Sequence, residues 1–273
     1  MRTWTWITII EAILLLFLLR EWSVAPDGRA HVFILDVGQG DAILLQSPSG
    51  KQVLIDGGPD TSVVRRLGEQ MSFFDRTIDL LVLTHPDADH LTGLPEILRR
   101  YHIDRALLTG IEKDTVRYRE FLSLLNRQQI PVTIADSRQD IDLGDGLILD
   151  IVWPTDSIFG TAPKAANNTS IVMRALHGSG SILLTGDIEK ETEALILASG
   201  ARIDTDILKV AHHGSRTSSM TGFVLATSPN LALISAGKDN PYGHPHPDVV
   251  TRYDFLRVPM RSTATEGTLE VAF

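Results

Sequence analysis

The sequence predicts a four-layer αββα sandwich in the α/β class, preceded by one N-terminal hydrophobic helix. Two observations lead to this fold class. Short apolar runs alternate with turn signals, and segments with the mixed polar and apolar spacing of amphipathic helices lie between them. The same succession of strands and helices then occurs a second time along the chain. Two sheets packed face to face, with helices outside, accommodate this order.

The first half of the chain supplies the first expected sheet and its helices. Its strands are short runs rich in Val, Ile and Leu: Val32 to Asp36, Ala42 to Gln46, Gln52 to Asp56 and Leu80 to Thr84. Amphipathic spacing predicts helices at Thr61 to Met71, Leu94 to Tyr101 and Thr115 to Gln128.

The second half repeats this pattern. Strands are expected at Leu147 to Trp153, Ser170 to Ala175, Ser181 to Thr185, Ile207 to Ala211 and Leu231 to Ser235. Helices are expected at Glu189 to Ser199 and Pro247 to Phe255. Residues 30–273 therefore form one expected catalytic domain, and residues 1–29 form an N-terminal segment and linker.

Composition narrows the function. The chain has 273 residues and a net charge of −9, which opposes broad electrostatic binding to nucleic acid or to anionic membranes. It has no cysteine, so disulfides and thiolate metal ligands are excluded. Any protein ligands to a metal are then imidazole and carboxylate groups.

The N-terminal segment is apolar from Ile7 to Leu19, with Trp4, Trp6 and Trp22 near its two ends. About 20 apolar residues cross a bilayer, so a single-pass membrane anchor is the first interpretation. A cleaved signal peptide and a buried helix of a soluble protein remain alternatives. The anchor predicts a hydrolase domain outside the cytoplasm, and the signal peptide predicts a secreted protein.

Candidate metal ligands follow the strand that ends at Thr84. His85, Asp87, Asp89 and His90 fall within six residues. Alternation along an extended loop would project His85, Asp87 and Asp89 together and turn His90 to another side. Nitrogen and oxygen donors without sulfur suit zinc, manganese or iron. The alternative is a polar loop that happens to be rich in Asp and His.

Three later segments also place polar groups after apolar strands or in rigid loops. Asp187 follows Thr185-Gly186 and could bridge two metals with its carboxylate or cap the next helix. His212 and His213 end another apolar strand, and His244 lies in a loop rich in proline. Ordinary turn and surface-loop roles compete with a metal or catalytic role at each of these positions.

Six motifs together resemble the metallo-β-lactamase superfamily, most closely the C-terminal hydrolase domain of ComEC competence proteins. The superfamily's His-x-His-x-Asp-His signature is present with Asp87 in place of the second histidine. In chain order the motifs are Asp36 to Asp41, Ile55 to Gly58, His85 to His90, Thr185 to Asp187, His212 to Ser215 and Asn240 to Pro245. The resemblance covers about Ala30 to Phe273 and implies the αββα fold.

The resemblance also implies roles for individual residues. It places His85 and Asp87 on a first divalent ion, Asp89, His90 and His213 on a second, and Asp187 between them as a bridge. His212 is a neighbouring candidate ligand. Behind the ligands, the expected supporting residues are Asp56, Asp36, Asp41 and Asn168 or its neighbour Asn167. His244 is expected to contact the substrate or to protonate the leaving group, which with Asp187 makes the expected catalytic pair.

The function implied is a metal-dependent phosphodiesterase, most simply a nuclease that acts on DNA through water activated by two metal ions, zinc or manganese. ComEC joins this domain to a polytopic channel, whereas at most one span is expected here. A role in DNA uptake would therefore need a separate channel protein as partner. Hydrolysis of a cell-wall or small-molecule phosphoester is the enzymatic alternative. A non-catalytic, metal-stabilised scaffold anchored to the membrane is the alternative from another class.

Overall fold

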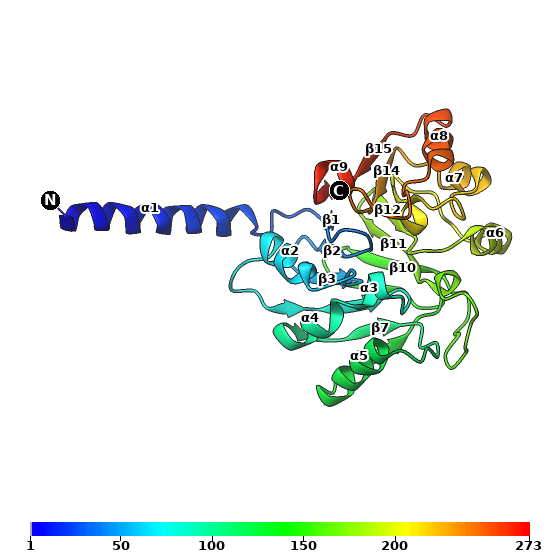
Figure 1. The fold of residues 1–273 in the computed structure, drawn as a ribbon, viewed down its shortest axis with the longest axis horizontal. Coiled ribbons are helices and arrows are strands. Elements are labelled where there is room, and N and C mark those ends of the chain that lie inside the picture. The colour runs from blue at the N-terminus through cyan, green and yellow to red at the C-terminus, as the bar shows by residue number, and fades with distance from the viewer. Residues whose placement is uncertain (1) are drawn as a thin grey trace.

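The structure is a computed structural model that describes residues 2–273. Two large sheets pack face to face, and helices cover their outer faces (Figure 1). Helices α4 and α5 lie on one side of the pair of sheets, and α6, α7 and α8 lie on the other (Figure 1). The predicted four-layer αββα sandwich is confirmed.

The first sheet has the strand order β16-β1-β2-β3-β5-β7-β8. Its half from β16 to β3 is antiparallel, and its half from β3 to β8 is parallel. Its strands are β1 (His31–Ile34), β2 (Ile43–Gln46), β3 (Gln52–Ile55), β5 (Leu80–Leu83), β7 (Ala106–Leu108), β8 (Val132–Ile134) and β16 (Leu269–Ala272). A separate two-stranded sheet pairs β4 (Thr77–Ile78) with β6 (His102–Ile103).

The second sheet repeats this plan in the order β15-β14-β13-β12-β11-β10-β9. Here the half from β15 to β12 is parallel and the half from β12 to β9 is antiparallel. Its strands are β9 (Ile141–Asp142), β10 (Ile148–Trp153), β11 (Val172–His177), β12 (Gly180–Leu184), β13 (Ile207–Lys209), β14 (Leu231–Ile234) and β15 (Met260–Ser262). Each sheet therefore has a parallel half whose strand ends can carry ligands.

The helices are mostly short and connect the strands. They are α1 (Arg2–Ser23), α2 (Ser62–Gln70), α3 (Ala88–Leu91), α4 (Leu94–Arg100), α5 (Val116–Arg127), α6 (Lys190–Ser199), α7 (Thr221–Thr227), α8 (Pro247–Phe255) and α9 (Thr263–Glu266). Two 3-10 turns complete them, η1 (Asn167–Thr169) and η2 (Ala211–Gly214). Most of the predicted helices and strands are present within one or two residues, whereas α3, α7, α9, the inner strand β7 and the short edge strands were not predicted.

Three apolar clusters hold the layers together. One lies between the sheets and joins side chains of both, including Ile34, Leu45, Ile151 and Leu184. The other two lie between each sheet and its covering helices, with Phe121 of α5 in one and Tyr253 of α8 in the other. Each sheet is thus buried on both faces, which explains why its strands read as continuous apolar runs.

Helix α1 projects from the domain as a separate rod (Figure 1). Its C-terminal half contacts the loop after α2: Phe17 lies edge-on to Phe73 and Phe74, with ring centroids 5.9 and 6.0 Å apart. Within the described residues, no helix combines the length and apolarity needed to cross a bilayer. The predicted transmembrane span is therefore not supported. The predicted interfacial role of Trp4 lies outside what the structure describes, because its side chain is not among those described.

Candidate metal centre

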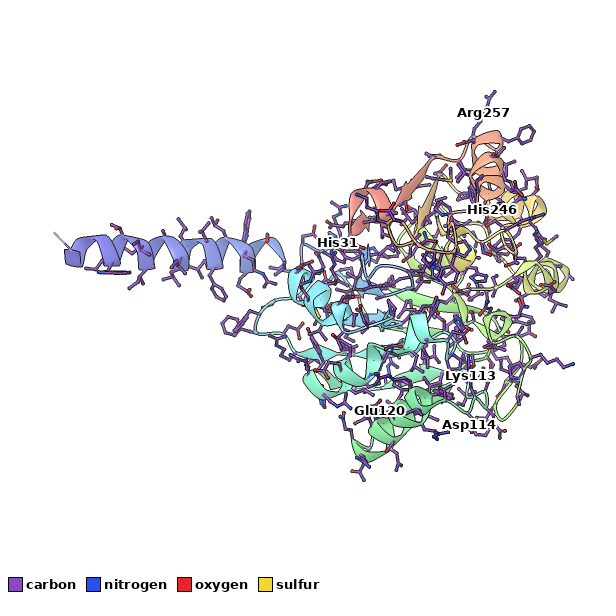
Figure 2. All side chains as sticks on the ribbon, viewed as in Figure 1. His31, Lys113, Asp114, Glu120, His246 and Arg257 are labelled. Atoms are coloured by element: carbon purple, nitrogen blue, oxygen red, sulfur yellow. The ribbon has the colours of Figure 1, made fainter. Side chains whose placement is uncertain are left out.

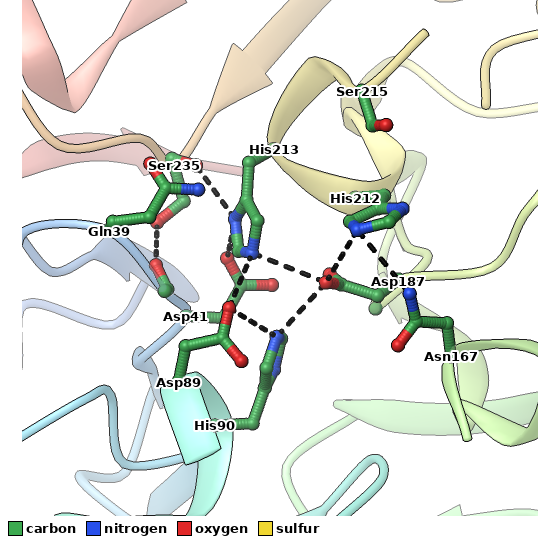
Figure 3. Close-up of polar contacts among 12 residues, drawn as sticks. Gln39, Asp41, Asp89, His90, Asn167, Asp187, His212, His213, Ser215 and Ser235 are labelled. Atoms are coloured by element: carbon green, nitrogen blue, oxygen red, sulfur yellow. Dashed lines mark hydrogen bonds and ion pairs between the residues drawn. The ribbon is translucent and has the colours of Figure 1, made fainter. Parts of the chain in front are cut away.

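The candidate ligands converge where the parallel halves of the two sheets end. His85 to His90 follow β5 of the first sheet, while Asp187 and His213 follow β12 and β13 of the second. The carboxyl ends of neighbouring parallel strands are a common place for functional groups, because loops there meet at one edge. Figure 3 shows side chains from both sheets pointing toward one another at this place.

The segment after β5 folds differently from the prediction. Ala88–Leu91 form the short helix α3, and Asp87 stands at its N-cap position. Strand alternation therefore does not apply, and the prediction that His90 turns away from Asp89 was wrong. The helical turn brings Asp89 and His90 to the same cluster, and the Asp87 carboxylate pairs with Lys113 instead.

Four residues form the core of the site: Asp89, His90, Asp187 and His213. One ligand atom from each lies within 4.8 Å of those of the others. Asp187 Oδ2 is 3.2 Å from both His90 Nε2 and His213 Nε2, and Asp89 Oδ2 is 3.3 Å from His213 Nε2. Ligand atoms that share one tetrahedral ion at bond lengths of about 2.0–2.2 Å are separated by about 3.3–3.6 Å. The spacing therefore fits one divalent cation.

The orientation of the histidines also fits a metal. His90 Nδ1 is 2.8 Å from the Asp56 carboxylate and His213 Nδ1 is 2.9 Å from the Ser235 carbonyl, so both Nδ1 atoms donate. A neutral imidazole in this orientation presents its Nε2 lone pair to the site, and neither Nε2 atom has a hydrogen-bond partner in the part of the chain that is described. Imidazoles held at Nδ1 by an oxygen and open at Nε2 are the usual arrangement of metal ligands.

His85 is oriented by two hydroxyl groups. Thr84 Oγ1 and Ser170 Oγ lie 3.0 and 3.1 Å from His85 Nδ1. Both hydroxyl protons are used elsewhere, on the Asp56 carboxylate and the Asn167 carbonyl. His85 Nδ1 must therefore donate, and its buried Nε2 has no partner among the described residues. His85 is poised as a ligand, although it lies outside the group of four.

Two buried carboxylates support the ligands from behind. Asp56 binds His90 and also accepts hydrogen bonds from the Thr84 amide at 2.8 Å and its hydroxyl at 2.7 Å. Asp41 Oδ1 lies 3.3 Å from His213 Nδ1 (Figure 3). The expectation that Asp56 and Asp41 act behind the ligands agrees with these contacts. Such carboxylates fix the orientation of an imidazole and increase its basicity.

Lys209 is a part of the site that the sequence reasoning did not single out. This fully buried lysine pairs with the Asp41 carboxylate and lies 3.8 Å from Asp187 Oδ1. Burial alone would lower the pKa of Lys209, but Asp41 and Asp187 outweigh it and raise the pKa. The ammonium therefore stays charged and offsets part of the carboxylate charge. A charged residue inside the apolar strand Ile207 to Val210 was the signal that could have found it.

The local charges favour a cation. Burial alone would lower the pKa of His90 and His213, but Asp187 together with Asp56 or Asp41 raises both well above the ordinary value. Burial opposes ionisation of Asp187, yet both imidazoles hold its pKa well below the usual range. The pKa of His85 falls to about 3, because it is buried and beside His90. The site thus stabilises positive charge next to Asp187, as a divalent ion requires.

His212 and His244 line the outer side of the site. His212 Nε2 is 3.9 Å from Asp187 Oδ2 and 3.3 Å from Asn167 Nδ2. His212 and His213 both have left-handed backbones, with φ of 51° and 54°. Such strained backbone is a feature of functional sites. His244 stands 5.8 Å from the His212 ring, centroid to centroid, so it is near the ligands without touching Asp187.

Two expected supporting residues have other partners. Asp36 pairs with Arg66 of α2 and accepts a hydrogen bond from the Gly38 amide at 3.4 Å, so its structural role lies at that turn. Asn168 Oδ1 accepts hydrogen bonds from the Glu189 amide at 2.9 Å and the Thr192 hydroxyl at 3.0 Å, which secures the start of α6. Of the two asparagines that were expected near the metal, Asn167 faces His212 at the edge of the site and Asn168 does not.

Comparison with known proteins identifies relatives of this chain. Several curated relatives match nearly the whole chain. ComE operon protein 3 of Bacillus subtilis is 32% identical over 264 residues, 90% of this chain and 33% of that protein. Recombination protein 2 of Haemophilus influenzae is 29% identical over 266 residues, 96% of this chain and 31% of that protein. The chain spans about a third of the length of these relatives.

The fold has solved counterparts. The metallo-beta-lactamase fold protein YhfI from Bacillus subtilis superposes with a TM-score of 0.56 at 12% identity, covering 88% of this chain and 99% of that one. The model of the metallo-beta-lactamase superfamily matches residues 35–238, which include the candidate ligands from His85 to His213. The chain therefore belongs to the metallo-beta-lactamase superfamily and has the fold of its metal-dependent hydrolases.

Proposed function

We propose that the chain is a phosphodiesterase that cleaves DNA with two divalent metal ions, zinc or manganese. The observation that carries the proposal is the convergence of Asp89, His90, Asp187 and His213 on one point, with His85 oriented toward the same region. The name of one relative, a recombination protein, favours a nucleic acid as substrate. A second ion would take His85 and Asp87, with Asp187 as the shared ligand.

Bound divalent ions would supply Lewis-acid chemistry, polarising the phosphoryl group and acidifying a water molecule. The chain's own residues do the rest. Asp56 and the Ser235 carbonyl hold the His90 and His213 rings with Nε2 facing inward. Asp187, which is 2% exposed, presents its carboxylate between the two rings and away from bulk water. A dry, preorganised set of charges stabilises the developing charge of phosphoryl transfer without reorganising.

We propose that His244 contacts the substrate. Partial burial and the neighbouring His213 and His212 lower its pKa to about 4, so its imidazole is neutral at pH 7. Gln39 Nε2 lies 3.5 Å from His244 Nδ1 and steadies the ring. A neutral imidazole is suited to hydrogen bonding with a phosphate ester, and less suited to donating a proton to the leaving group.

The test is a panel of substrates and metals. Purified protein loaded with manganese or with zinc is assayed on single-stranded DNA and on bis-p-nitrophenyl phosphate. Asp187→Ala should lower kcat/KM by more than about 100-fold, since even residues behind the ligands usually account for about 10- to 100-fold. Asp254→Ala, an exposed aspartate on α8, is the matched control. A folded Asp187→Ala variant with wild-type turnover would reject the proposed site.

The same panel separates the alternatives. Turnover of bis-p-nitrophenyl phosphate without cleavage of DNA would favour a cell-wall or small-molecule phosphoester. Stoichiometric metal with no turnover of any substrate would favour the metal-stabilised scaffold.

We also propose that the hydrolase domain works outside the cytoplasm, associated with the membrane through α1 or secreted. The support is the exposure of large apolar side chains around α1, among them Ile10, Leu16 and Trp22 at 63%, 66% and 79%. Exposed apolar surface of this kind usually marks an interaction site. A role in DNA uptake would place a separate channel protein beside it. Protease added to intact cells should degrade the domain, and full protection would contradict this location.

A further inference from the structure

A cavity of about 380 Å³ adjoins the metal centre at Asp87. Its polar lining is Asp87, Glu112, Lys113, Lys164, Asn167 and Glu189. Lys113 pairs with the Asp87 carboxylate from the loop between β7 and α5, near the start of α5 (Figure 2). We propose that Lys113 is the anion-binding group of a substrate subsite in this cavity, where it donates to a phosphate oxygen. This inference rests on the proposed phosphodiesterase function.

The position of Lys113 is set by a fixed loop. The Glu112 amide donates to the Thr161 carbonyl at 2.7 Å, which ties the loop to the segment that leads to Lys164. The buried Tyr118 hydroxyl donates to the Ile111 carbonyl at 3.2 Å. The two residues before Lys113 are therefore anchored. A charged group held by its scaffold binds a ligand at a lower entropic cost than a free surface lysine.

The Lys113 ammonium keeps hydrogen-bond donors for a ligand while it pairs with Asp87. Both side chains are 31% exposed, and exposed ion pairs contribute only about 0–1 kcal/mol to stability. Lysine has three N–H donors, and one suffices for the Asp87 carboxylate. The remaining donors are available to a substrate oxygen next to the metal centre. Asp87 would then share its charge between a metal ion and Lys113.

Charges on the cavity wall define the kind of group that enters. Lys113 and Lys164 come from two loops that line the cavity. Glu189 is engaged toward the second sheet, where it accepts a hydrogen bond from Thr217 Oγ1 at 2.8 Å. The phosphate oxygens are thus expected on the lysine side. Small-ligand pockets start at about 300 Å³, so the cavity accommodates one esterifying group of a phosphodiester.

The test measures anion binding directly. Isothermal calorimetry with inorganic phosphate is run on metal-loaded wild type, Lys113→Met, Lys113→Arg and the control Lys51→Met, with metal content measured in each. Lys51 is exposed on the β2–β3 hairpin and carries the same charge. Lys113→Met should raise the Kd for phosphate about 10- to 100-fold, the usual value of one charged hydrogen bond. Lys113→Arg should recover part of this loss, and Lys51→Met should match wild type.

Two results would overturn the inference. The first is a phosphate Kd for Lys113→Met within about two-fold of wild type at equal metal content. The second is a loss of phosphate binding that disappears when Lys113→Met is saturated with metal, since Lys113 would then only order Asp87. Neither result depends on turnover, so an inactive wild type that still binds phosphate through Lys113 would reject the proposed function and leave the subsite standing.

Discussion

Replacing Lys209 with methionine removes the charge that offsets the buried Asp41 carboxylate. The two side chains are 0% and 1% exposed, so no water can take over the role of the ammonium. Removing one partner of a buried ion pair usually costs about 3–5 kcal/mol. The Lys209 ammonium also donates to the Gly186 carbonyl at 3.3 Å, which would lose this bond as well. We therefore expect the free energy of unfolding of Lys209→Met to fall by about 4 kcal/mol.

The assay is urea unfolding in EDTA, with Lys51→Met as the control for loss of a lysine. The double variant Asp41→Asn/Lys209→Met should be less destabilised than the sum of the single variants, with a coupling above about 1 kcal/mol. This follows because the double variant leaves no unpaired buried charge. Additive effects, or a Lys209→Met variant as stable as Lys51→Met, would refute the argument that Lys209 neutralises Asp41.

Three further predictions concern the same region. The pKa values of His90 and His213 are raised in the folded state, so their protonated imidazoles stabilise the fold fully below about pH 6.5, and this contribution is lost as the pH rises through the raised pKa values. Urea unfolding in EDTA should therefore give a lower free energy of unfolding at pH 9 than at pH 6. The same free energy at both pH values would contradict this prediction. Gly40→Ala should lower the affinity for the metal at least about 10-fold, measured by titration calorimetry. A Cβ at this position would lie 2.2 Å from the Asp89 carbonyl oxygen and would displace α3. An unchanged affinity would show that the turn at Gly40 tolerates a side chain. Glu193→Gln should lower the free energy of unfolding by about 1–3 kcal/mol in urea. The two oxygens of the Glu193 carboxylate accept hydrogen bonds from the Ser219 and Met220 amides at 2.6 and 2.7 Å, whereas a glutamine side chain offers one oxygen. An unfolding midpoint equal to that of the wild type would show that these two hydrogen bonds do not stabilise the fold.

The ends of the buried strands were the most predictable part of the site. Asp187 and His213 each follow an apolar run after which the backbone turns, so their positions at a sheet edge follow from local pattern. That they meet His90 depends on two sheets stacking with their parallel halves together, and the order of six motifs supplied this expectation. The short helix α3 was missed because four residues are too few to show a helical period.

The partners of the charged residues were not predictable in the same way. Lys209 and Asp41 form an ion pair although they are far apart in sequence and belong to different sheets. The sequence around one of them does not predict contact with the other. Asp87 matches the motif of metal ligands, yet its observed partner is Lys113 from the loop after the next strand of the sheet. Asn167 and Asn168 are adjacent and chemically identical, and only the η1 turn decides which one faces His212.

The most direct test of the metal centre is an anomalous-scattering map from crystals of the protein loaded with zinc. A peak is expected within about 2.0–2.2 Å of His90 Nε2, His213 Nε2 and a carboxylate oxygen of Asp187. A second peak near His85 Nε2 would support the two-ion arrangement. Zinc bound only elsewhere on the surface, with no peak between His90 and His213, would contradict the assignment of this site as a metal centre.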